Sequence, residues 1–376
     1  MKLKHSHEIT DMETETGVPF YQKLSYNLVS LAIICLALIF ANDIILPILF
    51  SILLANLILP LTNYLVSKKF NRFLSIFLPV LLAIALTLGV IYFLSNQIMH
   101  FMNDVPVLKD RVNEVSLSFQ KWFRENTHMT IRKQNQYIND TVDNLKDNVP
   151  ELVGLTVVSI TGILAYVVLL PVMTFLILFY RNNIKAFLIS MFKNGSEDKV
   201  REVLNESTRI AQYYLIGLMI ETTLVFSFNC AGFLILGIKY AVFLALLGAL
   251  LNLIPYVGIF IANILCMLIT LVSSDDVSNV LWVGLILAVV QFLDNHFGMP
   301  LIVGNKVRIN ALATLTGILI GGALCGVPGM FLAIPALAVL KVIFDKVPDL
   351  QPWGVLLGDT ASNAEVKLKK VSKKSE

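Results

Sequence analysis

The feature that most constrains this chain is a series of long segments without a charged side chain. Such runs occupy residues 24–42, 44–67, 73–103, 152–180, 241–272, 279–293 and 311–340. Residues 211–236 form a further apolar run in which Glu221 is the only charge. A helix that spans a bilayer needs about 20 apolar residues. Because 56% of the residues are hydrophobic and only 15% are charged, the sequence predicts an all-α, polytopic integral membrane protein with about eight apolar segments.

The polar stretches between these runs divide the chain into seven predicted parts. Residues 104–151 place apolar side chains such as Val105, Leu108 and Val112 at helical spacing, which predicts a helical insert. The predicted order is a cytoplasmic N-terminal segment at 1–23, three transmembrane helices in 24–103, an extracytoplasmic helical insert at 104–151, a fourth transmembrane helix at 152–180, a basic cytoplasmic helical linker at 181–210, a transport core at 211–344 and a cytoplasmic tail at 345–376.

The distribution of Lys and Arg predicts the orientation of these segments. Short loops rich in Lys and Arg stay in the cytoplasm, which places Lys68, Lys69 and Arg72, the basic linker and both termini inside. The loop at 273–276 has no Lys or Arg and fits the outside, whereas the loop at 304–310 and the Lys-rich tail fit the inside. These assignments agree only if the runs 241–272 and 311–340 each enter and leave the membrane on one side. We therefore expect two re-entrant helical hairpins.

Both of these runs are interrupted near their centres by proline and glycine. Pro255 and Gly258 break the first run, and Gly326, Pro328 and Gly329 break the second. A shift of 71 residues aligns the sequence GIFIA at 258–262 with GMFLA at 329–333. Since each hairpin also follows one helix, the units 211–272 and 279–340 predict an inverted repeat, an architecture common in transporters. The alternative is a pair of kinked helices in a packed bundle.

Polar residues within the apolar runs are the candidates for a transport path. An intramembrane carboxylate is costly and is a functional candidate by default, which singles out Glu221 and Asp294. Broken helices leave backbone groups free to meet a solute or an ion. The full candidate set is Glu221, Thr222, Asn252, Pro255, Gly258, Asp294, Asn295, Gly326, Pro328 and Gly329. Structural alternatives remain open, because Asp294 can lie at the membrane interface and Asn side chains can join helices by hydrogen bonds.

Other chemistries lack support in the sequence. The four cysteines lie in apolar runs and no Cys/His spacing indicates a metal, so we expect neither a metal nor another cofactor. No phosphate-binding loop and no nucleophile–base set stands out, so we expect no enzyme activity. The net charge of +3 is too small to indicate nucleic-acid binding.

Several motifs in the C-terminal half resemble one known family. NLIPYVG at 252–258, DNHFGMPLIVGNKVRINAL at 294–312, GGALCGVPGMFLAIPALAVLKVIFD at 321–345 and LQPWGVLLGD at 350–359 are similar to the autoinducer-2 exporter family of PerM-like permeases. The chain departs from the family pattern at Ile259, Ala311 and Cys325, which stand where the family usually has Pro, Pro and Trp. The resemblance implies a multi-pass bacterial inner-membrane protein that forms a homo-oligomer. Members have been linked to export of autoinducer-2 and to exchange of Na⁺ or Li⁺ for H⁺.

Two functional hypotheses follow from the residues and the resemblance together. The first is a secondary transporter (permease) that exports a small polar solute such as autoinducer-2, or exchanges Na⁺ or Li⁺ for H⁺, with Glu221 or Asp294 carrying the coupling charge. The second is a passive, channel-like or scaffold membrane oligomer without ion coupling. Both imply the lipid bilayer as a partner and cytoplasmic termini, and neither implies nucleic acid.

Overall fold

The computed structural model describes residues 20–126, 167–192, 197–255, 257–274, 276, 278–298 and 309–358. Within 102–126 it describes the backbone and not the side chains. Over these ranges the chain is helical and has no strand, apart from an isolated bridge between Ile309 and Gly358. The helices follow in the order α1 (Phe20–Phe40), α2 (Asn42–Ser67), α3 (Arg72–Asn126), the helix Val167–Phe179, α5 (Arg181–Ser190), α6 (Glu197–Ile235), α7 (Ala241–Leu251), α8 (Val257–Ser273), α9 (Ser278–Leu293), η1 (Asp294–Gly298), α11 (Ala311–Lys346), η3 (Pro348–Leu350) and α12 (Gln351–Leu357).

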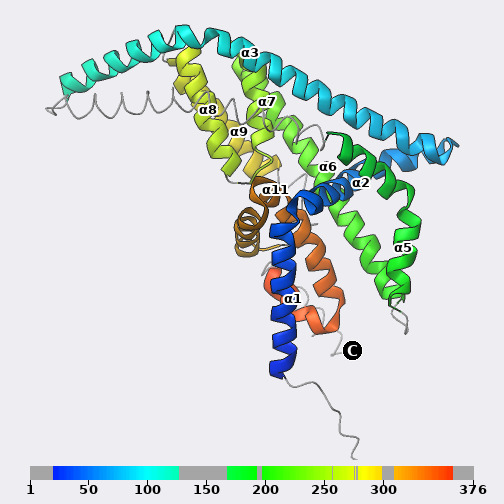
Figure 1. Cartoon of the computed structure of the whole chain (residues 1–376). Coiled ribbons are helices and arrows are strands. Elements are labelled where there is room, and N and C mark those ends of the chain that lie inside the picture. Colours follow the sequence, from blue (N-terminus) through cyan, green and yellow to red (C-terminus); the bar gives the residue numbers. More distant parts are fainter. Residues whose placement is uncertain are drawn as a thin grey trace, which may run out of the picture.

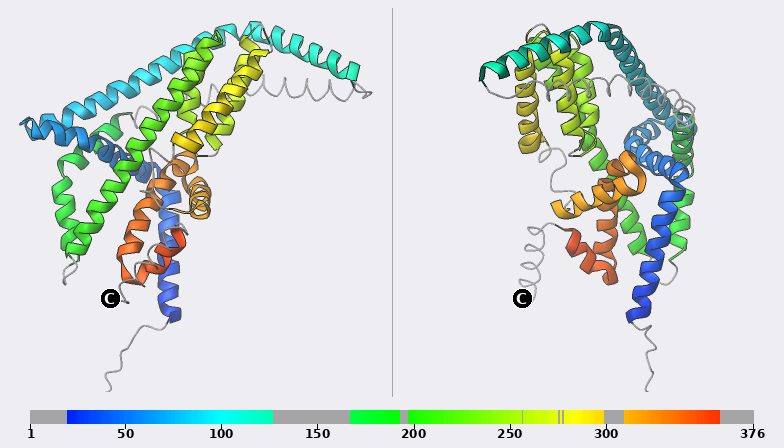
Figure 2. Two further views of the ribbon diagram at one scale, coloured as in Figure 1. Left: turned by 180° about the vertical axis from the view of Figure 1, so that it is seen from behind. Right: turned by 60° about the vertical axis from the view of Figure 1, so that its left-hand side comes forward.

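The long helix α3 lies across one end of the molecule, and α6, α7, α8 and α9 run away from it (Figure 1). The start of α1, the end of α5 with the start of α6, and α12 lie towards the opposite end, as the views in Figure 2 also show. α3 also runs through residue 103 without a break. The first part of the predicted insert at 104–151 therefore continues this helix, and the rest of that insert lies outside the described residues.

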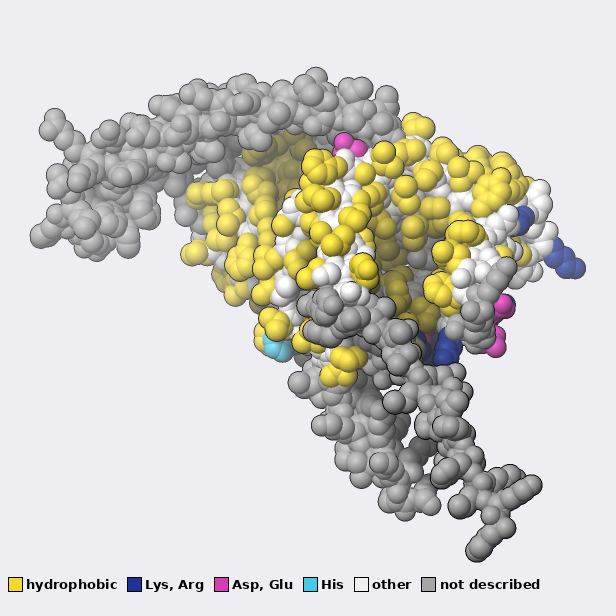
Figure 3. All heavy atoms as spheres, turned by 60° about the horizontal axis from the view of Figure 1, so that its bottom comes forward, with side chains coloured by type: hydrophobic (Ala, Val, Ile, Leu, Met, Phe, Trp, Pro, Cys, Tyr) yellow, Lys and Arg dark blue, Asp and Glu magenta, His cyan; other side chains and the backbone are white. Residues whose placement is uncertain are grey.

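Five helices of the described chain are long and apolar enough to cross a membrane: Asn42–Ser67, Arg72–Phe101, Glu197–Ile235, Ser278–His296 and Ala311–Lys346. Val167–Phe179 and Arg181–Ser190, bent by 63° relative to each other, make a sixth if they form one span. Large hydrophobic side chains cover much of the outer surface, and charged ones lie mainly at the margins of the face in Figure 3. An all-helical protein with several membrane spans is thus confirmed, whereas the count of eight segments stays a prediction.

The chain reverses direction between α7 and α8. The thiol of Cys266 in α8 lies 3.6 Å from the carbonyl oxygen of Leu244 in α7, so the two short helices pack side by side. Gly258 lies at the point of closest approach, because a Cβ at this position would lie 2.6 Å from the carbonyl carbon of Leu251. The Pro255–Gly258 interruption is therefore a turn between antiparallel helices, and its tightness excludes any side chain at residue 258.

α11 also folds back on itself. Gly326 has φ 63° and ψ −150°, a conformation that is essentially restricted to glycine, and Cys325 beside it is also non-helical. A Cβ at Gly321 would lie 3.4 Å from the Cβ of Ala333, although 12 residues of straight helix would separate the two by about 18 Å. The two arms of α11 therefore pack against each other on either side of the break.

Several apolar clusters connect these elements. One joins the end of α6 to α7, α8 and α9 around Phe233 and Leu244, and a second joins α6 to the arms of α11 around Leu218 and Ile334. The third packs α2 against α3 and the helix Val167–Phe179 around Ile76. α6 thus contacts both helical reversals, which places its middle at the centre of the C-terminal half.

Candidate functional site

Glu221 lies on the buried face of α6. Its side chain is only 7% exposed, and Tyr214, Leu218 and Val225 share this face because they stand three to seven residues away on the same helix. α6 is apolar here, so nothing on its own helix neutralises the carboxyl. A buried charge of this kind needs a partner from another element.

The nearest ionisable neighbour is Asp294, a second carboxyl, which repels the charge of Glu221 instead of neutralising it. Its carboxyl lies close enough to interact with Glu221, and also with the side chain of Asn252. Asp294 begins η1, a π-helical turn that continues α9, and such turns change the direction in which side chains point. Gly298 leaves room for the carboxyl, since a Cβ there would lie 2.6 Å from Asp294 Oδ1.

Asn252 comes from the turn between α7 and α8. It is the C-terminal cap of α7, and its backbone N–H donates to the carbonyl oxygen of Gly248 at 3.0 Å. The site therefore forms where the middle of α6, the end of α9 and the break after α7 meet. Of the ten predicted candidates, the structure brings together Glu221, Asn252 and Asp294. These three residues are called the Glu221 group below.

Three other predicted residues lie nearby without joining this group. The hydroxyl of Thr222 donates to the carbonyl oxygen of Leu218 at 2.8 Å, so its own helix already uses it. Asn295 is exposed and accepts a hydrogen bond from Gln291 at 3.1 Å. Pro255 is half-buried within the turn that follows Asn252.

The glycines and proline of the second break lie elsewhere. Gly326 and Pro328 are exposed and Gly329 is buried between the two arms of α11. Cys325, next to this tip, lies 3.9 Å from the carbonyl oxygen of Leu38 in α1. The tip of α11 thus faces α1, whereas its arms pack against α6 near Leu218, one turn from Glu221.

Two residues of the site escaped the sequence analysis. Tyr214 stands seven residues before Glu221 and lies close enough to it for an electrostatic interaction, which the helical period of seven could have indicated. Gly298 follows Asp294 by four residues, and a glycine one turn after an intramembrane carboxyl is a sign that the carboxyl needs space.

Asp276 fixes the start of the helix that carries Asp294. Its carboxylate accepts hydrogen bonds from the backbone N–H of Ser278 at 2.9 Å and from the Ser278 hydroxyl at 2.7 Å. These two hydrogen bonds favour the ionised form and lower the pKa of Asp276 from its ordinary value. Asp276 thereby caps α9 in the loop outside the apolar segments.

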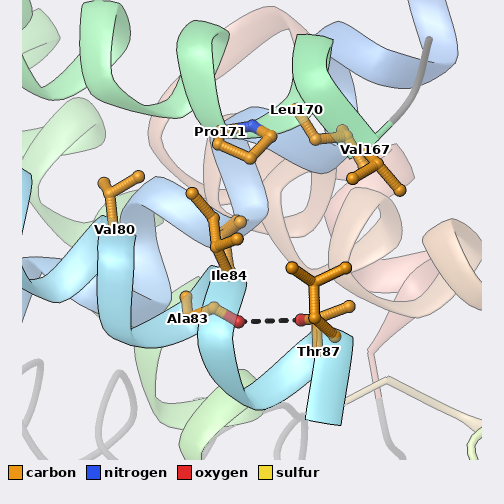
Figure 4. Close-up of a pocket in the computed structure, with 9 residues that line it drawn as sticks. Val80, Ala83, Ile84, Thr87, Val167, Leu170 and Pro171 are labelled. Carbon is orange, nitrogen blue, oxygen red and sulfur yellow. Dashed lines mark hydrogen bonds between the residues drawn. The ribbon is translucent and has the colours of Figure 1, made fainter. Parts of the chain in front are cut away.

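A separate cavity of about 190 Å³ lies between α2, α3 and the helix Val167–Phe179 (Figure 4). Its lining is apolar except for Thr87, whose hydroxyl donates to the carbonyl oxygen of Ala83 at 2.9 Å. Ile84 and Val167 point towards the gap between the helices (Figure 4). Nothing in this lining can orient a polar solute, so the Glu221 group remains the better candidate for a transport site.

The side-chain chemistry of the Glu221 group determines which ligands it can bind. Two carboxyls and an amide can accept and release a proton or bind a cation. Among the residues that the structure describes, no three His, Cys, Asp or Glu side chains gather as metal ligands would.

Several helices that are long and apolar enough to cross a membrane, around the buried Glu221 and the half-buried Asp294, are typical of a multi-pass membrane protein. A sequence model described as AI-2E family transporter matches residues 28–349. The chain belongs to this family, and the resemblance identified from its motifs is confirmed.

Several relatives of the chain are named as putative transport proteins, in agreement with this family. The chain is 24% identical to "Putative transport protein YueF" of Bacillus subtilis over 82% of its length and 85% of the relative. It is 28% identical to "Putative transport protein MT0215" of Mycobacterium tuberculosis over 78% of its length and 80% of the relative. It is also 21% identical to "Putative transport protein YhhT" of Escherichia coli over 93% of its length and 97% of the relative.

Proposed function

We propose that this protein is a secondary transporter of the bacterial cytoplasmic membrane. It exports a small polar solute such as autoinducer-2, or it exchanges Na⁺ or Li⁺ for H⁺. The observation that carries this proposal is the proximity of the buried Glu221 to the half-buried Asp294, with Asn252 beside them at the end of a broken helix. Membership of a transporter family supports it independently.

Electrostatics explains how this group couples transport to an ion. Two carboxylates side by side in an apolar surrounding repel each other, so a proton or a cation must neutralise part of their charge. Asn252 adds a neutral side chain that can donate to or accept from the same ligand. Loss of the proton then makes the site ready for a cation, and binding of the cation opposes protonation.

The two helical reversals supply the moving parts. At 1.5 Å per residue, α7 and α8 extend for about 17 Å and 26 Å, less than the roughly 30 Å of a hydrocarbon core. We take α7 with α8, and the two arms of α11, as re-entrant hairpins related by the inverted repeat. Gly258 and Gly329, the residues aligned by the shift of 71, support this relation because each is pressed against a backbone carbonyl of its preceding arm.

Orientation and assembly complete the proposal. The start of α1, the end of α5 with the start of α6, and α12 lie at one end of the molecule (Figure 1). The sequence of α5 and of the first part of α6 is also rich in Lys and Arg. We assign this end to the cytoplasm by the positive-inside rule. We also take the functional unit to be a homo-oligomer, as the family resemblance implies.

Flux through proteoliposomes tests the ion coupling. Purified protein is reconstituted, a pH gradient is imposed, and uptake of Na⁺, Li⁺ and autoinducer-2 is followed. The gradient should drive flux, and Glu221→Gln and Asp294→Asn should each abolish the driven component. Glu197→Gln is the matched control, because Glu197 is an exposed carboxylate in the first turn of the same helix. Flux that is the same with and without the pH gradient, and the same in both site variants, would refute coupling to protons. It would support the passive, channel-like alternative.

A further inference from the structure

A second cavity, of about 430 Å³, lies between α2, α5 and the first half of α6. α5 and this part of α6 lie side by side in Figures 1 and 2. Half of its lining is apolar, including Ile52, Leu59 and Leu188, and the other half is polar. The lining contains three basic side chains, Arg181, Lys185 and Arg209, and no carboxylate. This polar and basic lining differs from that of the apolar cavity in Figure 4. Its positive charge is also opposite to the negative charge that the carboxyls of the Glu221 group can carry.

The basic side chains of this cavity are poorly neutralised. Among the described residues, no carboxylate lies within 4.0 Å of the charged groups of Arg181 or Lys185. Their hydrogen-bond partners are neutral amides, with Arg181 donating to Asn63 at 3.0 Å and Lys185 donating to Asn205 at 2.7 Å. Of these three side chains, and within the described part of the chain, Arg209 alone has a carboxylate within 4.0 Å, that of Glu206 at 3.9 Å.

We propose that this cavity binds the phosphate group of an anionic phospholipid, with an acyl chain along its apolar wall. The charge of the lining selects a phosphate, which two or more basic side chains can hold. The apolar half of the lining selects a lipid over inorganic phosphate, which would leave that surface unused. The volume also falls within the range of about 300–1,000 Å³ that suits an organic ligand.

The neighbouring surface of α5 fits the same interpretation. Phe187, Met191 and Phe192 are each more than half exposed on or just after this short helix. Apolar side chains next to basic ones are typical of helices that lie at a membrane interface. The cavity therefore lies beside an exposed apolar surface that suits contact with lipid, and the site is independent of the transport reaction proposed above.

Lipid titration on the full chain tests this site. Phosphatidylglycerol, and separately phosphatidylcholine, are added to the protein in a non-ionic detergent, and bound lipid is measured by native mass spectrometry. The double variant Arg181→Gln, Lys185→Gln should weaken phosphatidylglycerol binding by about 30-fold, about fivefold for each charge removed. The matched control Lys68→Gln, Lys69→Gln removes two exposed charges outside the cavity and should change binding less than about twofold.

Further arms separate the remaining explanations. The exchange variant Arg181→Lys, Lys185→Arg keeps both charges and should keep most of the affinity. If the double Gln variant fails to fold, Arg209→Gln replaces it, because this side chain is 63% exposed, and a loss of about fivefold is expected. Equal binding of phosphatidylglycerol by wild type and Gln variants would overturn the proposal. Displacement of the lipid by inorganic phosphate would also overturn the proposal, and would identify a site for free anions.

Discussion

The fold-back of α11 makes one substitution, Gly329→Ala, a sharp test of the structure. An added Cβ would lie 2.7 Å from the carbonyl carbon of Gly321 and 2.8 Å from Cys325 Cβ. Carbon atoms in contact stay about 3.5–4.0 Å apart, so the two arms would have to separate by about 1 Å. Overpacking of this kind costs about 1–3 kcal/mol of folding free energy.

The matched control is Gly89→Ala in α3, where an added Cβ meets nothing within 4 Å. Removal of a helix-interior glycine in open space stabilises by about 0.5–1 kcal/mol. The two Gly→Ala substitutions should therefore shift stability in opposite directions. If α11 were a continuous rod, Gly329→Ala would also stabilise, because alanine favours the helix more than glycine does.

Thermal unfolding of the purified protein, followed with a dye that reacts with exposed thiols, provides the measurement. Cys266 is fully buried and reports unfolding of the α7–α8 region. Gly329→Ala should lower the unfolding temperature by about 2–6 °C, and Gly89→Ala should leave it equal or higher. Equal upward shifts in both variants would refute the fold-back of α11 and, with it, the second hairpin.

Three further substitutions examine contacts that hold the C-terminal half together. Asn310→Ala should cost about 2 kcal/mol, because Asn310 caps α11 and donates to two carbonyl oxygens of the α12 region; proteolysis of the C-terminal helix reports it. Lys346 in α11 forms an ion pair with Glu202 in α6, at 2.6 Å. Lys346→Gln should remove a coupling of about 0.5 kcal/mol, measured in a double-mutant cycle with Glu202, and added salt should reduce this coupling. Gly298→Ala should displace the carboxyl of Asp294 and reduce gradient-driven flux while the protein stays folded.

Each of these has a control and a contrary outcome. Asn310→Asp keeps the cap but loses the amide donors, so its stability should fall between wild type and Asn310→Ala. A coupling between Lys346 and Glu202 that is unchanged at high salt would contradict a half-exposed ion pair. Gly284→Ala meets only the flexible side chain of Met267, at 3.4 Å, and should leave flux unchanged. Equal flux losses in the Gly284 and Gly298 variants would remove the argument from Asp294.

The sequence predicted the parts of this fold that depend on local chemistry. Uncharged runs predicted membrane-spanning helices, because hydrocarbon tolerates few charges. Pro255 with Gly258, and Gly326 with Pro328, predicted where the helices break, because these residues disfavour a continuous helix. Both breaks occur in the structure at these positions. Whether the helices re-enter the membrane depends on the bilayer, and that part stays a prediction.

The assembly of the site could be predicted only in part. Glu221 and Asp294 stood out because each is a carboxyl within or at the end of an apolar run, but their contact depends on the π-helical turn at the end of α9. Adjacent residues on a helix point about 100° apart, so Asp294 and Asn295 could not both face α6, and Asn295 bonds to Gln291 instead. Thr222 was a weaker choice because threonine hydroxyls in helices bond to the preceding turn.

The sign of the electrostatic field at the Glu221 group narrows the mechanism further. Asn252 is the C-terminal cap of α7, and the C-terminus of a helix carries a partial negative charge. This partial charge adds to the two carboxyls, so all three contributions oppose an anion and favour a proton or a cation. A neutral cargo would therefore have to use the group as a proton or cation switch that biases the α7–α8 turn. Neutralisation of either carboxyl should then remove the dependence on the gradient before it removes solute binding.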